Sequence, residues 1–114
     1  MKNKIKFEVL KSFIGDDTQS LNHALGIMVD ELSASIELLQ SAYLVDDLST
    51  IAFHLHKIIS SLGYLGCELL VADIRQIRHG IEGDIYNHKT KQDVKNVLQE
   101  LENIRDELIT ILNQ

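Results

Sequence analysis

Two histidines, His54 and His56, stand two residues apart in the apolar stretch IAFHLHKIISSLGYLG, residues 51–66. A histidine ring is largely neutral at cellular pH, so its free nitrogen can act as a nucleophile, a base or a metal ligand. On a helix the two positions diverge by about 200°, and one metal ion cannot readily bind both. At most one of them is therefore placed to serve a given site.

The other polar residues do not indicate a metal centre or a catalytic nucleophile. None of the five histidines forms the i, i+4 pair that puts two ligands on one helix face, so we predict no metal site. The single cysteine, Cys67, lies near a predicted helix start, which could lower its thiol pKa. We favour a small residue that fills space in the core. The pair Asp46 and Asp47 is typical of a helix cap rather than of catalytic carboxylates.

Composition limits the class of protein. The 114 residues fit one domain, 1–114, with 45% hydrophobic and 25% charged residues. The net charge of -6 argues against nucleic acid and against direct contact with an anionic membrane. No apolar run approaches the roughly 18 residues of a membrane span. The lone cysteine fits a reducing compartment, so we predict a cytoplasmic location.

Apolar residues recur every three or four positions along nearly the whole chain, which predicts helices. We expect a short helix ending at Gly15, followed by helices near 17–43, 47–62, 66–80 and 90–112, with EGDIYNHKTK as the longest loop. Leu69 and Ala72 belong to the apolar stripe expected for the fourth helix, and Gly80 is expected to end it. The predicted fold is all-α: an antiparallel up-down-up-down four-helix bundle with a short additional N-terminal helix.

In the predicted third helix, the two histidines lie about 100° to either side of the apolar stripe, so geometry alone does not choose between them. Their neighbours differ. On the His56 side lie Ser49, Phe53, Ser60 and Gly63. On the His54 side lie Asp47, Thr50, Lys57 and Ser61, which we expect to form an ordinary solvated polar face. Small residues beside an exposed aromatic favour His56 as the place where another protein docks. Two ordinary surface histidines and a stray phenylalanine remain the alternative.

The spacing after His56 resembles the motif of the histidine phosphotransfer (HPt) domains of bacterial multistep phosphorelays. The family has an aliphatic residue two positions after the histidine, a glycine ten after it and a leucine thirteen after it, and here these are Ile58, Gly66 and Leu69. At three and four positions after His56, Ile59 and Ser60 replace the usual lysine and glycine. Counting from His54 keeps a lysine, Lys57, but puts Tyr64 where the glycine belongs. FEVLKSFIGDDTQSLNHAL and LLQSAYLVDDLSTIAFHLH resemble the opening of such domains and the approach to their phosphorylated histidine.

The resemblance implies that His56 accepts a phosphoryl group from the aspartate of a response-regulator receiver domain and relays it to another receiver. Such a domain needs no cofactor of its own, because the receiver brings the magnesium ion. The surroundings of the phosphoryl group would be Phe53, Lys57, Ile59, Ser60 and Gly63. Ile59 cannot offset phosphoryl charge, Lys57 points about 100° away from His56, and Arg75 or Arg78 on the next helix could reach across.

Family members occur as free-standing proteins and as cytoplasmic C-terminal modules of hybrid sensor kinases, some of them membrane-bound; the resemblance implies either setting. The alternative function is a helical protein-interaction module that is not phosphorylated, which the loss of both lysine and glycine favours. We expect a monomer, because the sequence shows no apolar stripe beyond the inferred core.

Overall fold

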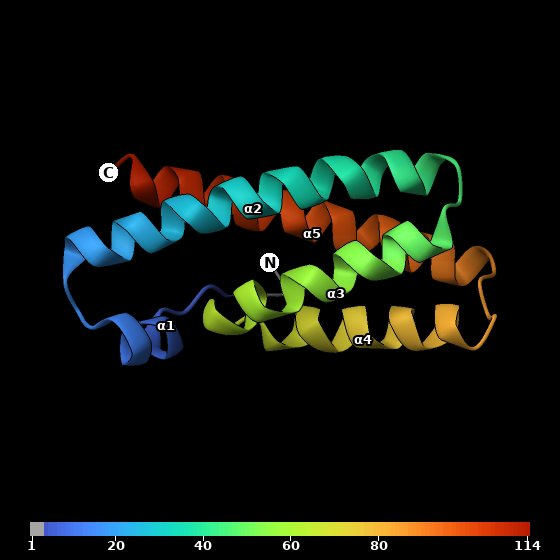
Figure 1. The fold of residues 1–114 in the computed structure, drawn as a ribbon, viewed down its shortest axis with the longest axis horizontal. Coiled ribbons are helices and arrows are strands. Elements are labelled where there is room, and N and C mark those ends of the chain that lie inside the picture. Colours follow the sequence, from blue (N-terminus) through green and yellow to red (C-terminus); the bar gives the residue numbers. More distant parts are fainter. Residues whose placement is uncertain (1–3) are drawn as a thin grey trace.

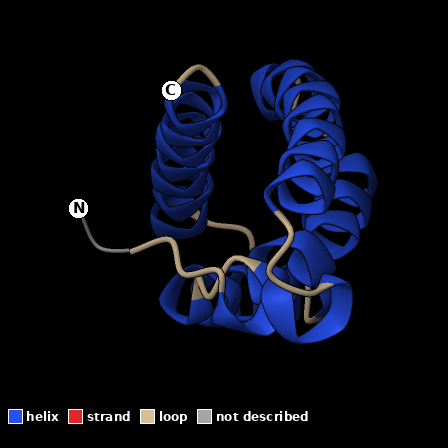
Figure 2. Cartoon of the chain, turned by 90° about the vertical axis from the view of Figure 1, so that its left-hand side faces the viewer, coloured by secondary structure: helices blue, strands red, loops and turns tan. Residues whose placement is uncertain are grey.

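The computed structural model describes residues 4–114, which form helices and loops without a strand (Figures 1 and 2). The helices within this range are α1 (Glu8–Ile14), α2 (Thr18–Leu44), α3 (Leu48–Tyr64), α4 (Glu68–Glu82) and α5 (His88–Leu112). The predicted all-α fold is confirmed.

The four long helices form a bundle in which each contacts its neighbours in the sequence and α5 returns to α2. Figure 1 shows that α2 and α4 run in one direction along the long axis, whereas α3 and α5 run in the other. The short helix α1 packs against α2 and α3 at one end. Leucine and isoleucine dominate the shared core, with fully buried side chains that include Leu32, Leu55, Ile74 and Leu101.

Side-chain caps fix the starts of α2, α3 and α5, the last through Asn87. The carboxylate of Asp17 accepts a hydrogen bond from the Ser20 N–H at 2.9 Å, at the start of α2. Asp47 caps α3, because its carboxylate accepts from the Thr50 N–H at 3.3 Å and from the Thr50 hydroxyl at 2.7 Å. These bonds favour the charged carboxylate and lower the pKa of Asp47. The interpretation of Asp47 as a cap is confirmed.

The predicted bounds of α4 are wrong at both ends of the helix. Gly80 does not end it, since the helix continues to Glu82 and the next helix already begins at His88. A glycine inside a helix is tolerated, and here it leaves room for the returning chain: a Cβ on Gly80 would lie 3.1 Å from the Ile85 carbonyl oxygen.

The apolar stripe predicted for α4 is wrong at two positions. Leu69 and Ala72 are exposed rather than part of the core.

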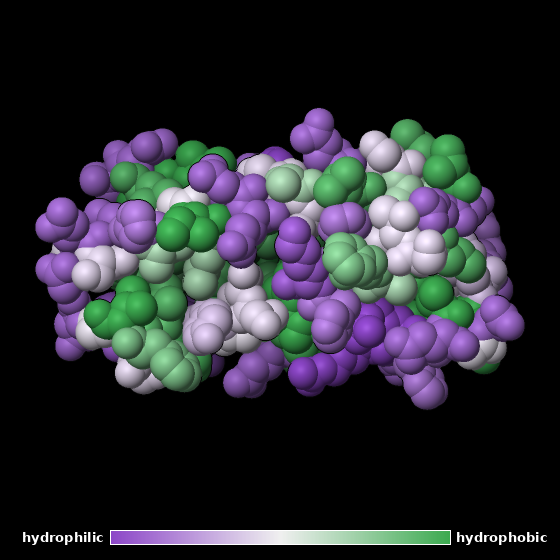
Figure 3. All heavy atoms as spheres, viewed as in Figure 1, coloured by the Kyte–Doolittle hydropathy of each residue, from purple (hydrophilic) through white to green (hydrophobic). Residues whose placement is uncertain are grey.

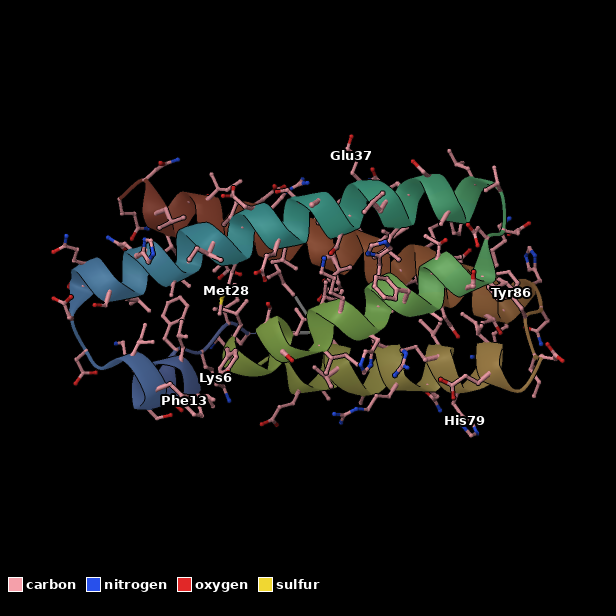
Figure 4. The ribbon with its side chains drawn as sticks, in the orientation of Figure 1. Lys6, Phe13, Met28, Glu37, His79 and Tyr86 are labelled. Atoms are coloured by element: carbon pink, nitrogen blue, oxygen red, sulfur yellow. The ribbon has the colours of Figure 1, made fainter. Side chains whose placement is uncertain are left out.

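The chain before α1 closes the end of the bundle at the α3–α4 turn. The Lys6 N–H donates to the Leu65 carbonyl at 2.8 Å, and Figure 4 shows Lys6 beside the C-terminal end of α3. Phe13 of α1 meets the ring of Tyr64 edge to face, with centroids 5.5 Å apart. These contacts hold α1 over the turn.

Candidate functional site

A hydrogen bond from Ser61 identifies the side of α3 that faces α2. Its hydroxyl donates to Oε2 of Glu31 at 3.4 Å, and Ser61 is buried, so the expectation that it lies on a solvated polar face is wrong. His54, seven residues earlier, lies within about 20° of Ser61 around the helix, whereas His56 lies about 140° away. Because α4 packs against the other side of α3, His54 lies towards α2 and His56 towards α4.

His54 is half-buried at the α2–α3 boundary. Its Nδ1 atom is enclosed and has no hydrogen-bond partner among the described residues. The edge of one ring meets the face of the other where His54 packs against Phe53, with centroids 5.0 Å apart. Burial lowers the pKa of His54, and the charge of Lys57 lowers it further. Both effects favour the neutral form of His54, and one of its ring nitrogens is withdrawn from solvent.

His56 lies on an open surface of α3. We call the exposed row of Ser49, Phe53, His56, Ser60 and Gly63 the His56 face. Phe53 is 64% exposed, and a Cβ placed on Gly63 would have no neighbour within 4 Å. Figure 3 views the side of the bundle on which α3 lies in front, and apolar and polar side chains alternate there. Apart from Phe53, the neighbours of His56 in this row are small, so they leave the imidazole open to approach.

Ile59 and Lys57, the neighbours that flank His56 around the helix, do not supply it with a cation. Ile59 is half-buried and packs against the hydrophobic core, so this position contributes to the packing of α3. Lys57 is exposed, but the residue whose pKa it perturbs is His54, three positions before it on the same side of the helix. Neither neighbour therefore replaces the lysine that the resemblance implies beside His56.

Two arginines of α4 lie on its α3 side. The α5 side of α4 is marked by Asp73, Gln76 and Ile77, which line a groove of about 420 Å³ between α4 and α5. Arg75 lies about 100° or more around the helix from all three, and Arg78 follows it three residues later. Arg78 pairs with Glu82 at 3.4 Å and its Nε is enclosed.

Arg75 remains exposed, and within residues 4–114 it makes no ion pair. It also lies at the height of His56. The α3–α4 turn reverses the chain at residues 65–67, and His56 stands nine residues before Leu65 whereas Arg75 stands eight after Cys67. At 1.5 Å per residue, the two side chains start from nearly the same level on adjacent helices. Arg75 therefore starts at about the height of His56, on the flank of α4 that adjoins α3.

Cys67 does not have the environment of a nucleophile. It precedes α4, as expected, but its side chain is buried in the core. Burial raises the pKa of the thiol to about 11, and the charges of Glu107 and Glu100 act in the same direction. The suggestion that the helix start lowers this pKa is wrong, and the interpretation of Cys67 as a core residue is confirmed.

Large apolar side chains are exposed outside the core. A monomer was expected because the sequence shows no apolar stripe beyond the inferred core, and these side chains contradict that premise. Ile27 and Leu38 of α2 are each 48% exposed, and Val45, directly after the helix, is 74% exposed. Sequence reasoning missed them because the core residues of α2 recur at the same three- and four-residue spacing. A second stripe on one helix is resolved only when burial is known.

Residues 4–114 contain no group of three or more His, Cys, Asp or Glu side chains placed to hold a metal ion. None of the helices in this range has both the length and the hydropathy to cross a lipid bilayer. Comparison with protein-family models, with curated protein sequences and with solved structures finds no match to this chain.

Proposed function

We propose that this protein is a phosphocarrier of the HPt type, in which His56 accepts a phosphoryl group from a receiver-domain aspartate and passes it to a second receiver. The observation that carries the proposal is the contrast between the two histidines. His56 stands on an open row of small residues beside an exposed phenylalanine, whereas His54 has an enclosed nitrogen and faces α2. An exposed imidazole of this kind is the only reactive group that a phosphocarrier needs. We propose that this one acts in the cytoplasm, either free-standing or joined to a hybrid sensor kinase.

The chemical step is a displacement at phosphorus. The unprotonated ring nitrogen of His56 attacks the phosphorus of the aspartyl phosphate, an N–P bond forms, and the bond to the aspartate oxygen breaks. The carboxylate of the receiver is released, and the phosphorylated ring gives its remaining N–H proton to solvent. The receiver supplies the magnesium ion that offsets phosphoryl charge. This chain contributes position and access, which are the main requirements of such a transfer.

The Arg75 guanidinium is the best-placed substitute for the lysine that Ile59 replaces. Arg75 starts at about the height of His56 on the adjacent helix, and it forms no ion pair with a carboxylate of the described residues. Arg78 is less suited, because Glu82 already pairs with it. A guanidinium presents several N–H donors to phosphoryl oxygens in a fixed planar arrangement. We therefore assign to Arg75 the role of stabilising the charge of the phosphoryl group during transfer.

Replacing Arg75 with glutamine should slow phosphoryl acceptance by about 2- to 5-fold, the range set by an exposed ion pair. Arg75→Lys should retain most of the rate, and the difference between Arg75→Gln and wild type should shrink at high salt. Rates would be followed as transfer from a phosphorylated receiver. Lys95→Gln on α5 serves as the control for loss of one positive charge, and an equal effect of that change would contradict the assignment.

Transfer itself is the test of the proposal. The purified protein would be mixed with a panel of receiver domains phosphorylated by acetyl phosphate and magnesium, and label on the chain would be measured. We expect rapid transfer from at least one receiver of the same organism and return of the label to a second. If no receiver of that organism passes phosphate to the chain, it functions instead as a helical interaction module.

A further inference from the structure

We propose that two copies of this chain associate through an exposed stripe on α2. The stripe consists of Ile27, Glu31, Ala34, Leu38 and Ser41 of α2 and of Val45, the residue directly after the helix, all of them exposed. The intervals are four, three, four, three and four residues, which is the spacing of a coiled-coil seam. Figure 3 shows apolar side chains along α2 on the face turned towards the viewer. This inference does not depend on phosphotransfer.

The stripe is separate from the His56 face. Glu31 is bonded to Ser61, so the stripe runs along the flank of α2 that adjoins α3 on the His54 side. His56 lies on the opposite flank of α3, towards α4. In Figure 4 Glu37 of α2 points away from α3. A partner on α2 can therefore be held while His56 stays accessible.

The order of residues in the stripe identifies a second copy as the partner, because the stripe complements itself when two copies run antiparallel. Residue 36 would lie at the centre of the antiparallel pair, so each residue faces the residue of the second copy that is equally far from 36 in the other direction. Ala34 then meets Leu38 of the second copy, and Ile27 meets Val45. A small residue opposite a large one allows close packing, and two aliphatic residues meet at each end. Glu31 would face the Ser41 hydroxyl, which can donate to it. A two-fold interface requires this kind of self-complementary patch.

The contact would be small. From Ile27 to Val45 the stripe spans about 27 Å at 1.5 Å per residue, and it is one helix wide. That area lies below the roughly 800 Å² per partner of a standard stable interface. The dimer should therefore be weak, so that monomers dominate in dilute solution and the dimer is populated only at high protein concentration.

Sedimentation velocity across a concentration series tests the proposal on the full chain. Wild type should sediment as a species of 12.9 kDa when dilute and should approach twice that mass when concentrated. Leu38→Glu should weaken association at least 10-fold. Leu44→Glu is the matched control, because Leu44 is 78% exposed yet lies about 120° around the helix from Leu38. Circular dichroism would show that both variants fold.

A charge pair tests the antiparallel register. In the double variant Ile27→Glu, Val45→Glu, like charges face each other and the dimer should be lost. In Ile27→Glu, Val45→Lys, each glutamate faces a lysine of the second copy, so association should persist at low salt and weaken as salt rises. A wild-type chain that stays monomeric at every concentration would overturn the proposal. So would equal behaviour of the two double variants, or equal loss in Leu38→Glu and Leu44→Glu.

Discussion

Replacing His56 with glutamine is expected to abolish phosphoryl acceptance, whereas His54→Gln should leave it nearly unchanged. Glutamine keeps a polar side chain of similar length but has no nucleophilic ring nitrogen. His56 is exposed, so the fold should not depend on it. Acceptance would be measured as label transferred from a phosphorylated receiver. A loss of at least 100-fold is the expected result for His56→Gln, because the His56 face holds no second imidazole and its serine hydroxyls are weak nucleophiles.

The same experiment identifies the acceptor chemically. A phosphoramidate is labile in acid and stable in base, whereas an acyl phosphate is cleaved in base, so label on the wild-type chain should survive alkali. His54→Gln also reports on packing, since the His54 ring contacts Phe53 and its Nδ1 is enclosed. Its thermal stability should therefore change even though transfer does not. Acceptance retained in His56→Gln, or lost only in His54→Gln, would move the site to the other histidine.

The helices could be predicted from the sequence because local signals agree with one another. Apolar periodicity marks α2 and α5, and Asp47 is at once a turn residue and the acceptor that caps α3. The prediction failed where a glycine that is typical of a helix end has a different role. Gly80 looks like a helix stop, but the structure uses its missing side chain to admit the Ile85 carbonyl while the helix continues.

The choice between the histidines shows what periodicity leaves open. His54 and His56 are nearly symmetric about the core direction of α3, so a helical wheel gives them equal exposure. Their surroundings differ because α2 covers one flank of α3. The hydrogen bond between Ser61 and Glu31, which are thirty residues apart in the chain, marks that flank. Such a contact depends on how the helices are arranged. The α2 stripe is concealed for the same reason: Leu38 and the buried Leu39 are adjacent, and only packing tells them apart.

Gly66 and Leu69, which carry part of the resemblance to HPt domains, have different structural roles here. Gly66 follows the C-terminal end of α3 with a φ of 72°, a left-handed conformation that costs a side-chain-bearing residue about 1–2 kcal/mol. A Cβ on Gly66 would also lie 3.0 Å from Cβ of Lys6. Leu69, in contrast, is 58% exposed. The matched glycine therefore reflects the turn between α3 and α4 and the crossing of the N-terminal segment.

Gly66→Ala is accordingly expected to destabilise the protein by about 1–3 kcal/mol, which lowers the melting temperature by about 5–15 °C. Gly63→Ala is the control, because Gly63 lies in helical backbone and its Cβ would meet no atom within 4 Å. That change should leave the stability unaltered or raise it by up to about 1 kcal/mol. Thermal unfolding followed by circular dichroism compares the two; equal melting temperatures would contradict the structural role of Gly66.

Two further variants separate the backbone cost from the steric cost at Gly66. Asparagine tolerates left-handed backbone better than alanine, so Gly66→Asn should recover stability if the φ of 72° dominates. Lys6→Gly removes the facing Cβ, so it should partly rescue Gly66→Ala if the contact with Lys6 dominates. Neither residue belongs to the His56 face. Below its melting temperature, Gly66→Ala should therefore accept phosphate at the wild-type rate, which would assign this part of the motif to folding and leave transfer to His56.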